Sequence, residues 1–219
     1  MNKIGFMQGR LSPIMGNKIQ CFPTGYWENE FSLAKKIEIH LMEWTIDYDD
    51  LYQNPLMQKK GREKIKYLSE FNNLKIPSLT GDCFMQKPFW KKTPKESKLL
   101  KNIFLDICKA CSEIGIEMII VPLVDQGSLE SSIERERLIS FLIENNDFFK
   151  KLSLKILFES DFKPIKLKEF IKQLPYDTFG INYDIGNSAS QGFDAYEEFE
   201  YYGNHIINVH IKDRKLNGT

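Results

Sequence analysis

Residues 179–186 read FGINYDIG, a short run in which apolar and polar side chains alternate. Because successive side chains of a β-strand point to opposite faces, Ile181 and Tyr183 fall on one face, and Asn182 and Asp184 fall on the other. The alternation predicts a strand that packs its apolar face against other elements and carries a carboxylate at the C-terminal end of its polar face.

The same alternation recurs elsewhere in the chain. Four more segments gather polar side chains on one face: residues 41–47 with Glu43 and Thr45, 77–82 with Ser78, Thr80 and Asp82, 155–160 with Glu159, and 207–213 with Asn208, His210 and Lys212. In these segments the polar residues extend toward the C-terminal end of the expected strand. The pattern indicates one shared polar surface.

Strand-like runs alternate with stretches whose apolar residues recur at helical spacing. We expect strands over residues 3–7, 40–46, 75–80, 117–123, 154–159, 179–185 and 205–211. We expect helices over residues 28–37, 57–73, 95–115, 129–152, 165–174 and 194–203. Consecutive parallel strands need a crossover connection, usually a helix, so this strict alternation predicts a parallel sheet in an α/β fold.

The polar strand faces favour a sheet that closes on itself. In a doubly wound open sheet, the main alternative, helices cover both faces and the strands are apolar on both. A (β/α)8 TIM-type barrel instead turns one face inward and carries its functional residues at the C-terminal ends of the strands. We therefore expect residues 1–219 to form a single TIM-barrel domain, truncated at its C-terminal end because the eighth βα unit is missing from this chain.

Composition narrows the class of function. Thirty Lys and Arg balance thirty Asp and Glu, so the chain lacks the basic field that gives sequence-independent affinity for nucleic acid. The N-terminal residues do not resemble a signal peptide, and no run approaches the roughly 18 apolar residues of a membrane helix. We expect a cytoplasmic protein that binds neither nucleic acid nor a membrane.

Cys108 and Cys111 form a CxxC pair, one of the spacings found in metal and redox sites. Both fall inside the expected helix 95–115, among apolar residues at three- and four-residue spacing. We therefore expect both thiols to be core residues.

Glu159, Asp184 and His210 stand near the ends of three consecutive strands, each on the polar face. Two carboxylates and an imidazole from neighbouring strands could bind a divalent cation, with Mn²⁺ or Mg²⁺ as suitable as Zn²⁺. The alternative is a buried network of ion pairs without a metal. The spacing alone leaves both open.

Four motifs occur in order along the chain: GFMQGRLSP at 5–13, MEWTID at 42–47, YDIGNS at 183–188 and NVHIKDR at 208–214. Together they resemble the xylose isomerase-like TIM-barrel superfamily, specifically its sugar (phosphate) isomerase and epimerase branch. The resemblance implies a (β/α)8 barrel with one divalent metal at its C-terminal mouth. Relatives hold that metal with Glu, Asp, His and Glu from strands five to eight, and Glu159, Asp184 and His210 match the first three.

The resemblance also implies an activity. The implied enzyme is a divalent-metal-dependent isomerase or epimerase of carbohydrate metabolism that acts on a sugar or sugar phosphate through an enediolate. Its metal would be Mn, Mg, Co or Zn. Glu159 would be both metal ligand and base, and Lys212 a further catalytic group. The substrate-binding candidates are Arg10, Glu43, Asp82, Asn187 and Arg214. The expected partner is a small-molecule carbohydrate, and a homodimer is one assembly compatible with the sequence.

The chain departs from the family pattern at two points. Asn187 stands where related ketose epimerases have a histidine, and an amide can hydrogen-bond a sugar hydroxyl but cannot carry a proton. The eighth strand, which supplies the fourth ligand and a second carboxylate base in relatives, is absent from the chain.

Three other functions are alternatives to isomerisation. Endonuclease IV, a member of the same superfamily, needs many histidines to bind three zinc ions and a basic groove to bind DNA. This chain has only three histidines and a balanced charge, which exclude an endonuclease function of that kind. An inosose dehydratase-like lyase uses the same stabilised enolate and stays open. So does a non-catalytic truncated barrel that binds a sugar or a partner protein.

Overall fold

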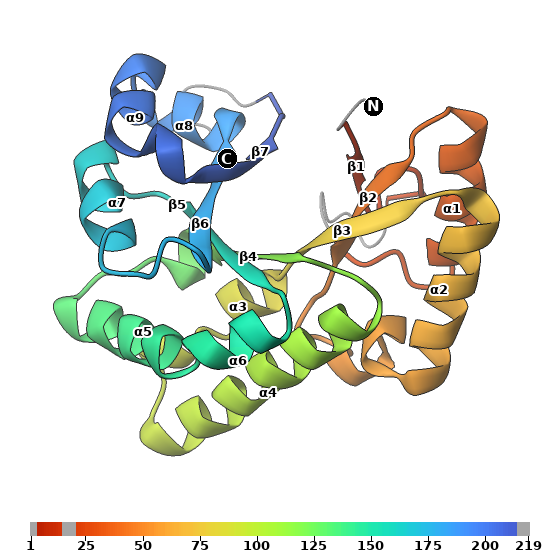
Figure 1. Ribbon diagram of the computed structural model, residues 1–219, viewed down its shortest axis with the longest axis horizontal. Coiled ribbons are helices and arrows are strands. Elements are labelled where there is room, and N and C mark those ends of the chain that lie inside the picture. The colour runs from red at the N-terminus through yellow and green to blue at the C-terminus, as the bar shows by residue number, and fades with distance from the viewer. Residues whose placement is uncertain (1–3, 15–20, 214–219) are drawn as a thin grey trace.

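Seven parallel strands form one sheet in the order β1-β2-β3-β4-β5-β6-β7 in the computed structural model, which describes residues 4–14 and 21–213 (Figure 1). The strands are β1 (Phe6–Met7), β2 (Leu41–Thr45), β3 (Lys75–Thr80), β4 (Met118–Leu123), β5 (Lys155–Ser160), β6 (Phe179–Asp184) and β7 (Ile206–His210). Every strand expected from the sequence is present, and each pairs with the next one in parallel.

Helices follow the strands and lie around the outside of the sheet (Figure 1). The α-helices are α1 (Trp27–Lys36), α2 (Lys59–Asn72), α3 (Asp82–Gln86), α4 (Pro94–Glu113), α5 (Ser132–Glu144), α6 (Asn146–Lys151), α7 (Pro164–Ile171), α8 (Ile185–Gln191) and α9 (Ala195–Tyr202). Short 3-10 helices are η1 (Leu51–Gln53), η2 (Pro55–Met57), η3 (Phe89–Lys91), η4 (Asp125–Gly127) and η5 (Gly203–His205).

The sheet is strongly curved. Glu43 on β2 and His210 on β7 are five strands apart in the sheet order, yet Glu43 Oε1 and His210 Nε2 are 2.8 Å apart. In a flat sheet, with neighbouring strands about 4.8 Å apart, they would be separated by about 24 Å. The predicted fold class is therefore confirmed: the described residues form a curved sheet of seven parallel strands with helices outside it, a partial TIM-type barrel whose polar strand faces turn inward.

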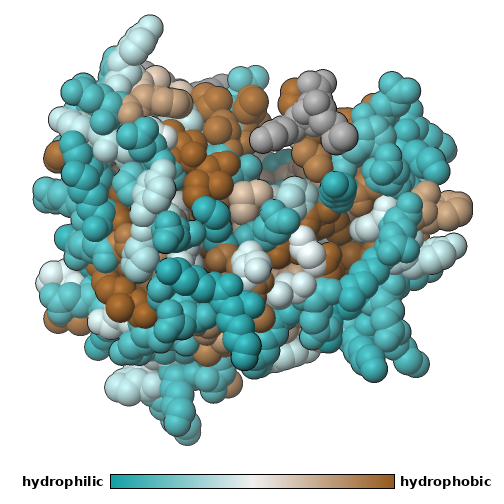
Figure 2. Space-filling view, in the orientation of Figure 1, coloured by the Kyte–Doolittle hydropathy of each residue, from teal (hydrophilic) through white to brown (hydrophobic). Residues whose placement is uncertain are grey.

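The outer face of the sheet is apolar and packs against helices. Phe158 of β5 is fully buried and makes an edge-to-face contact with Phe170 of α7, with ring centroids 5.1 Å apart. The outer face of β7 is different, because Ile207 and Val209 are 39% and 44% exposed. Figure 2 shows apolar surface near β7.

The boundary between β6 and α8 differs from the expected one. Ile185 was expected to end the strand, but it begins α8, because the Asp184 carboxylate accepts a hydrogen bond of 2.8 Å from the backbone N–H of Asn187. An aspartate in this N-cap position satisfies a donor that the first helical turn leaves unpaired. Asp184 therefore both ends the strand and begins the helix.

The expected helix 129–152 is also divided. It forms α5 and α6, which meet at Asn145, whose side chain donates to the carbonyl of Phe141 at 2.8 Å.

The prediction of core thiols is confirmed, since Cys108 and Cys111 lie on α4 and both are fully buried.

Across residues 4–14 and 21–213, none of the helices has both the length and the apolar character needed to cross a membrane.

Candidate metal and active site

Glu159, Asp184 and His210 meet at the C-terminal ends of β5, β6 and β7. Asp184 and His210 are direct partners in the parallel register, and Glu159 is the fifth of the six residues of β5. One ligand atom from each of the three side chains lies within 4.8 Å of the others. The fold thus places close together the three side chains that the spacing pattern grouped, although each follows a different strand.

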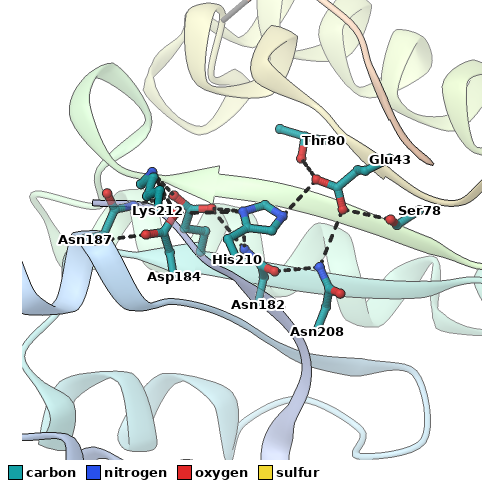
Figure 3. Close-up of polar contacts among 10 residues, drawn as sticks. Glu43, Ser78, Thr80, Asn182, Asp184, Asn187, Asn208, His210 and Lys212 are labelled. Atoms are coloured by element: carbon teal, nitrogen blue, oxygen red, sulfur yellow. Dashed lines mark hydrogen bonds and ion pairs between the residues drawn. The ribbon is translucent and has the colours of Figure 1, made fainter. Parts of the chain in front are cut away.

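The His210 ring lies between the carboxylates of Glu159 and Asp184 on one side and the carboxylate of Glu43 on the other (Figure 3). Its Nδ1 is 3.2 Å from Glu159 Oε2 and 3.8 Å from Asp184 Oδ2. Its Nε2 is 2.8 Å from Glu43 Oε1 on the opposite side of the ring. Each imidazole nitrogen therefore faces a different carboxylate environment.

Lys212 reaches the same cluster from the segment after β7. Its ammonium is 2.7 Å from Asp184 Oδ2 and 4.0 Å from Glu159 Oε1. Gly186 permits this approach, because a Cβ at that position would lie 2.6 Å from Lys212 Cγ and 2.7 Å from the Lys212 carbonyl oxygen. The predicted catalytic lysine is thus in contact with two of the predicted metal ligands.

Asn182 and Asn208, which are not among the predicted site residues, also belong to the site. Asn182 Nδ2 is 3.0 Å from Glu159 Oε2, and Asn208 Nδ2 donates to Asn182 Oδ1 at 2.8 Å. Each asparagine stands two residues before a predicted ligand on the same strand face. That period-two spacing from Asp184 and His210 was the signal available in the sequence.

Asn187 uses one of its two side-chain polar atoms in a hydrogen bond within the site. Its Nδ2 donates to Glu159 Oε1, and its Oδ1 is buried without a hydrogen-bond partner in the described part of the chain. A buried carbonyl oxygen without a donor is costly, so this atom has the chemistry to accept a hydrogen bond from a ligand hydroxyl.

Glu43 is buried among donors. Ser78 Oγ donates to its Oε2 at 2.7 Å, and Asn208 Nδ2 lies 3.5 Å from the same oxygen. Its Oε1 accepts from Thr80 Oγ1 and lies against the His210 ring. Side chains from β3 and β7 thus contact both carboxylate oxygens of this β2 residue.

The charges of the cluster stabilise one another. Burial alone would lower the pKa of His210, but the hydrogen bonds and negative charges of Glu159 and Glu43 raise it to about 10. Burial alone would raise the pKa of Glu43, but His210, together with Thr80 and Ser78, holds it below its usual value. These shifts favour the protonated form of His210 and the ionised form of Glu43.

The two remaining carboxylates respond in opposite directions. Burial opposes ionisation of Glu159, yet the hydrogen bond and charge of His210, and the charge of Lys212, lower its pKa. Burial and the negative charge of Glu159 raise the pKa of Asp184, which Lys212 only partly offsets. Three carboxylates thus face two cationic side chains.

Two other predicted substrate-binding residues, Arg10 and Asp82, follow strands β1 and β3. Arg10 is exposed in the connection after β1, and Asp82 is buried at the first position of α3, directly after β3. Parallel strands present their C-terminal ends on one side of a barrel. Arg214 lies outside the described residues, and the roles of all three stay predictions.

The fold and the site together define a parallel βα barrel with a carboxylate and imidazole cluster at its C-terminal mouth. The sequence model of one family matches residues 31–218, and its description is "xylose isomerase-like TIM barrel". The chain belongs to this family. No curated protein sequence matches the chain.

Solved structures share the fold. A xylose isomerase domain protein from Planctomyces limnophilus superposes with a TM-score of 0.71 at 12% identity, covering 98% of this chain and 76% of its own. D-psicose 3-epimerase from Clostridium cellulolyticum H10 gives 0.70 at 12% identity, over 84% and 66%. A 3-keto-D-glucoside 4-epimerase from E. coli gives 0.70 at 15% identity, over 96% and 79%.

Proposed function

We propose that this chain is a divalent-metal-dependent isomerase or epimerase that acts on a sugar or sugar phosphate through an enediolate. The observation that carries the proposal is the meeting of Glu159, Asp184 and His210 at the C-terminal mouth of a xylose isomerase-like barrel. Two similar structures are named as epimerases of D-psicose and of a 3-keto-D-glucoside, which fits a small carbohydrate substrate. We also propose that residues 1–219 form one domain.

The residues present fit a divalent ion. Ligand atoms held at roughly 2.0–2.6 Å from an ion lie within about 5 Å of one another, and the three candidate atoms are within 4.8 Å. Glu159, Asp184 and His210 supply two oxygens and one nitrogen, a set suited to Mn, Mg, Co or Zn. Because the raised pKa of His210 favours its protonated form, and a metal needs a neutral imidazole, binding would release a proton.

Glu159 is the proposed base. Its lowered pKa keeps it ionised near neutral pH, so it can accept a proton from the carbon next to a substrate carbonyl. A bound divalent ion would stabilise the negative charge that develops on the substrate oxygens. Lys212, with an ammonium 4.0 Å from Glu159 Oε1, is the proposed second catalytic group, positioned to donate a hydrogen bond to a substrate oxygen.

Specificity would come from groups around this centre. Asn187 offers a buried carbonyl oxygen to a sugar hydroxyl. Arg10 and Asp82 follow β1 and β3 on the same side of the barrel, where a guanidinium suits an anionic group and a carboxylate suits hydroxyls. Arg214 is a further substrate contact predicted from the sequence.

Metal titration tests the centre. Mn²⁺ is titrated by calorimetry into chelator-stripped protein and into the His210→Ala and His205→Ala variants. His210→Ala removes the only nitrogen ligand of the three, so we expect affinity to fall by more than about 100-fold, the upper range for loss of an outer partner. His205 is in η5, before β7, and its replacement leaves affinity unchanged. Equal affinities in all three proteins contradict the metal site.

Proton exchange tests the reaction. Ketoses and their phosphates are incubated with the Mn²⁺-loaded chain in D₂O, and deuterium incorporation next to the carbonyl is followed by NMR. We expect incorporation with at least one sugar and its loss in Glu159→Gln. Loss of water without an isomeric sugar favours the lyase, and saturable sugar binding without incorporation favours the non-catalytic barrel.

A further inference from the structure

We propose that Glu43 is a positioning residue that accepts the Nε2–H of His210, so that Nδ1 is the nitrogen presented to the metal. The inference rests on the proposed metal site, and it gives Glu43 a role different from the substrate contact suggested by the sequence. Glu43 would act through His210 and would not itself touch metal or substrate.

The orientation of the His210 ring carries the inference. Nδ1 faces the two other candidate ligands, at 3.2 Å from Glu159 Oε2 and 3.8 Å from Asp184 Oδ2. Nε2 points the opposite way and is 2.8 Å from Glu43 Oε1 (Figure 3). Neutral imidazole carries one proton, and the hydrogen bond made by one nitrogen determines which nitrogen keeps a lone pair for the metal. With Glu43 as acceptor, that nitrogen is Nδ1.

The position of Glu43 is fixed before any metal binds. Ser78 Oγ donates to Oε2 at 2.7 Å, and Thr80 Oγ1 donates to Oε1. Both hydroxyls come from β3, the direct neighbour of β2, and Ser78 is the register partner of Glu43. The carboxylate is 8% exposed, so these protein donors take the place of water. An acceptor held in this way restricts rotation of the His210 ring.

The arrangement spans the barrel interior. Glu43 and His210 are 167 residues apart in the chain and lie on β2 and β7, which are not neighbours in the sheet. The hydrogen bond therefore couples the second βα unit to the seventh at the candidate metal centre. Partners that orient a ligating histidine commonly change metal affinity by roughly 10- to 100-fold when removed.

Zinc binding and histidine NMR test the inference. Zn²⁺ affinity is measured for chelator-stripped wild type, Glu43→Gln and Glu30→Gln. Glu30 is a matched control, because it is a fully buried carboxylate that accepts backbone hydrogen bonds from Gly9 and Leu11 at 2.9 to 3.0 Å. We expect Glu43→Gln to weaken Zn²⁺ binding about 10- to 100-fold and Glu30→Gln to leave it unchanged.

The nitrogen that binds the metal gives the second readout. In ¹⁵N spectra of the Zn²⁺-loaded wild type, we expect zinc on Nδ1 of His210 and a proton on Nε2. Zinc on Nε2 overturns the inference even if Glu43→Gln does not fold. Folded Glu43→Gln that binds zinc as tightly as wild type also overturns it, and leaves the metal site intact. A wild type that binds no divalent ion removes the proposed function, and the inference with it.

Discussion

The two faces of the sheet are made by alternate residues of the same strands, and they are stabilised by different interactions. On the outer face, Phe158 and its neighbours pack against helices through apolar contacts. On the inner face, Glu159 and His210 belong to a network of ion pairs and hydrogen bonds. A shift of one residue along β5 thus separates a contact that is insensitive to protons and ions from one that depends on both.

The difference has a consequence for function. Apolar packing on the outer side can hold the barrel together without a metal, because its energy comes from removal of apolar surface from water. Among residues 4–14 and 21–213, the inner network contains the carboxylates of Glu43, Glu159 and Asp184 and the cationic side chains of His210 and Lys212. The outer face therefore stabilises the fold, and the inner face leaves negative charge available for a ligand.

The largest expected effect comes from the outer face. Phe158→Ala removes a fully buried ring that contacts Phe170 and Phe179, and such substitutions typically cost about 3–5 kcal/mol. We expect the free energy of unfolding in urea to fall by this amount at every pH, because no titrating group is removed. A loss below about 1 kcal/mol, or one that changes with pH, contradicts the assignment of Phe158 to the outer core.

The inner face is expected to respond to pH. The pKa of His210 is raised to about 10 in the folded protein, whereas an unfolded histidine has a pKa of about 6.5. Between these values the folded state binds the extra proton, so stability is greatest below about pH 6.5 and falls as pH rises. The slope is about 1.4 kcal/mol per pH unit, or about 2 kcal/mol from pH 7 to 8.5.

This slope is measured by urea unfolding of chelator-stripped protein across that range, where most other groups do not titrate. His210→Gln removes the group and should flatten the curve, while Phe158→Ala should shift it downward and leave the slope unchanged. A flat wild-type curve means that Glu43 and Glu159 do not hold the proton on His210. At the other end of the strand, burial and the charge of Lys172 lower the pKa of His205. Titration of His205 therefore does not contribute to a loss of folding stability as the pH rises above 7.

The face of the sheet on which a side chain lies could be predicted from the sequence, whereas contacts across the barrel could not. Period-two alternation gave the correct face to Glu159, Asp184 and His210, because strand geometry alone determines it. The contact between Glu43 and His210 could not be predicted, since it depends on how tightly seven strands curve. Ile185 was wrongly assigned to a strand, because the hydrogen bond from Asn187 to Asp184 overrides its β-branched preference. The break at Asn145 is a comparable local event.

The smallest expected effect comes from the part of the outer face that helices cover least. Val209 on β7 is 44% exposed, so Val209→Thr keeps the branched shape and places a hydroxyl where water can reach it. We expect a change in unfolding free energy within about 0.5 kcal/mol. Val121 on β4 is the matched control: it is fully buried and is the register partner of Phe158. Val121→Thr buries the same hydroxyl and should cost about 1–3 kcal/mol. Equal losses in the two variants would mean that the outer face of β7 is covered in solution, and that the difference between the two outer surfaces does not hold.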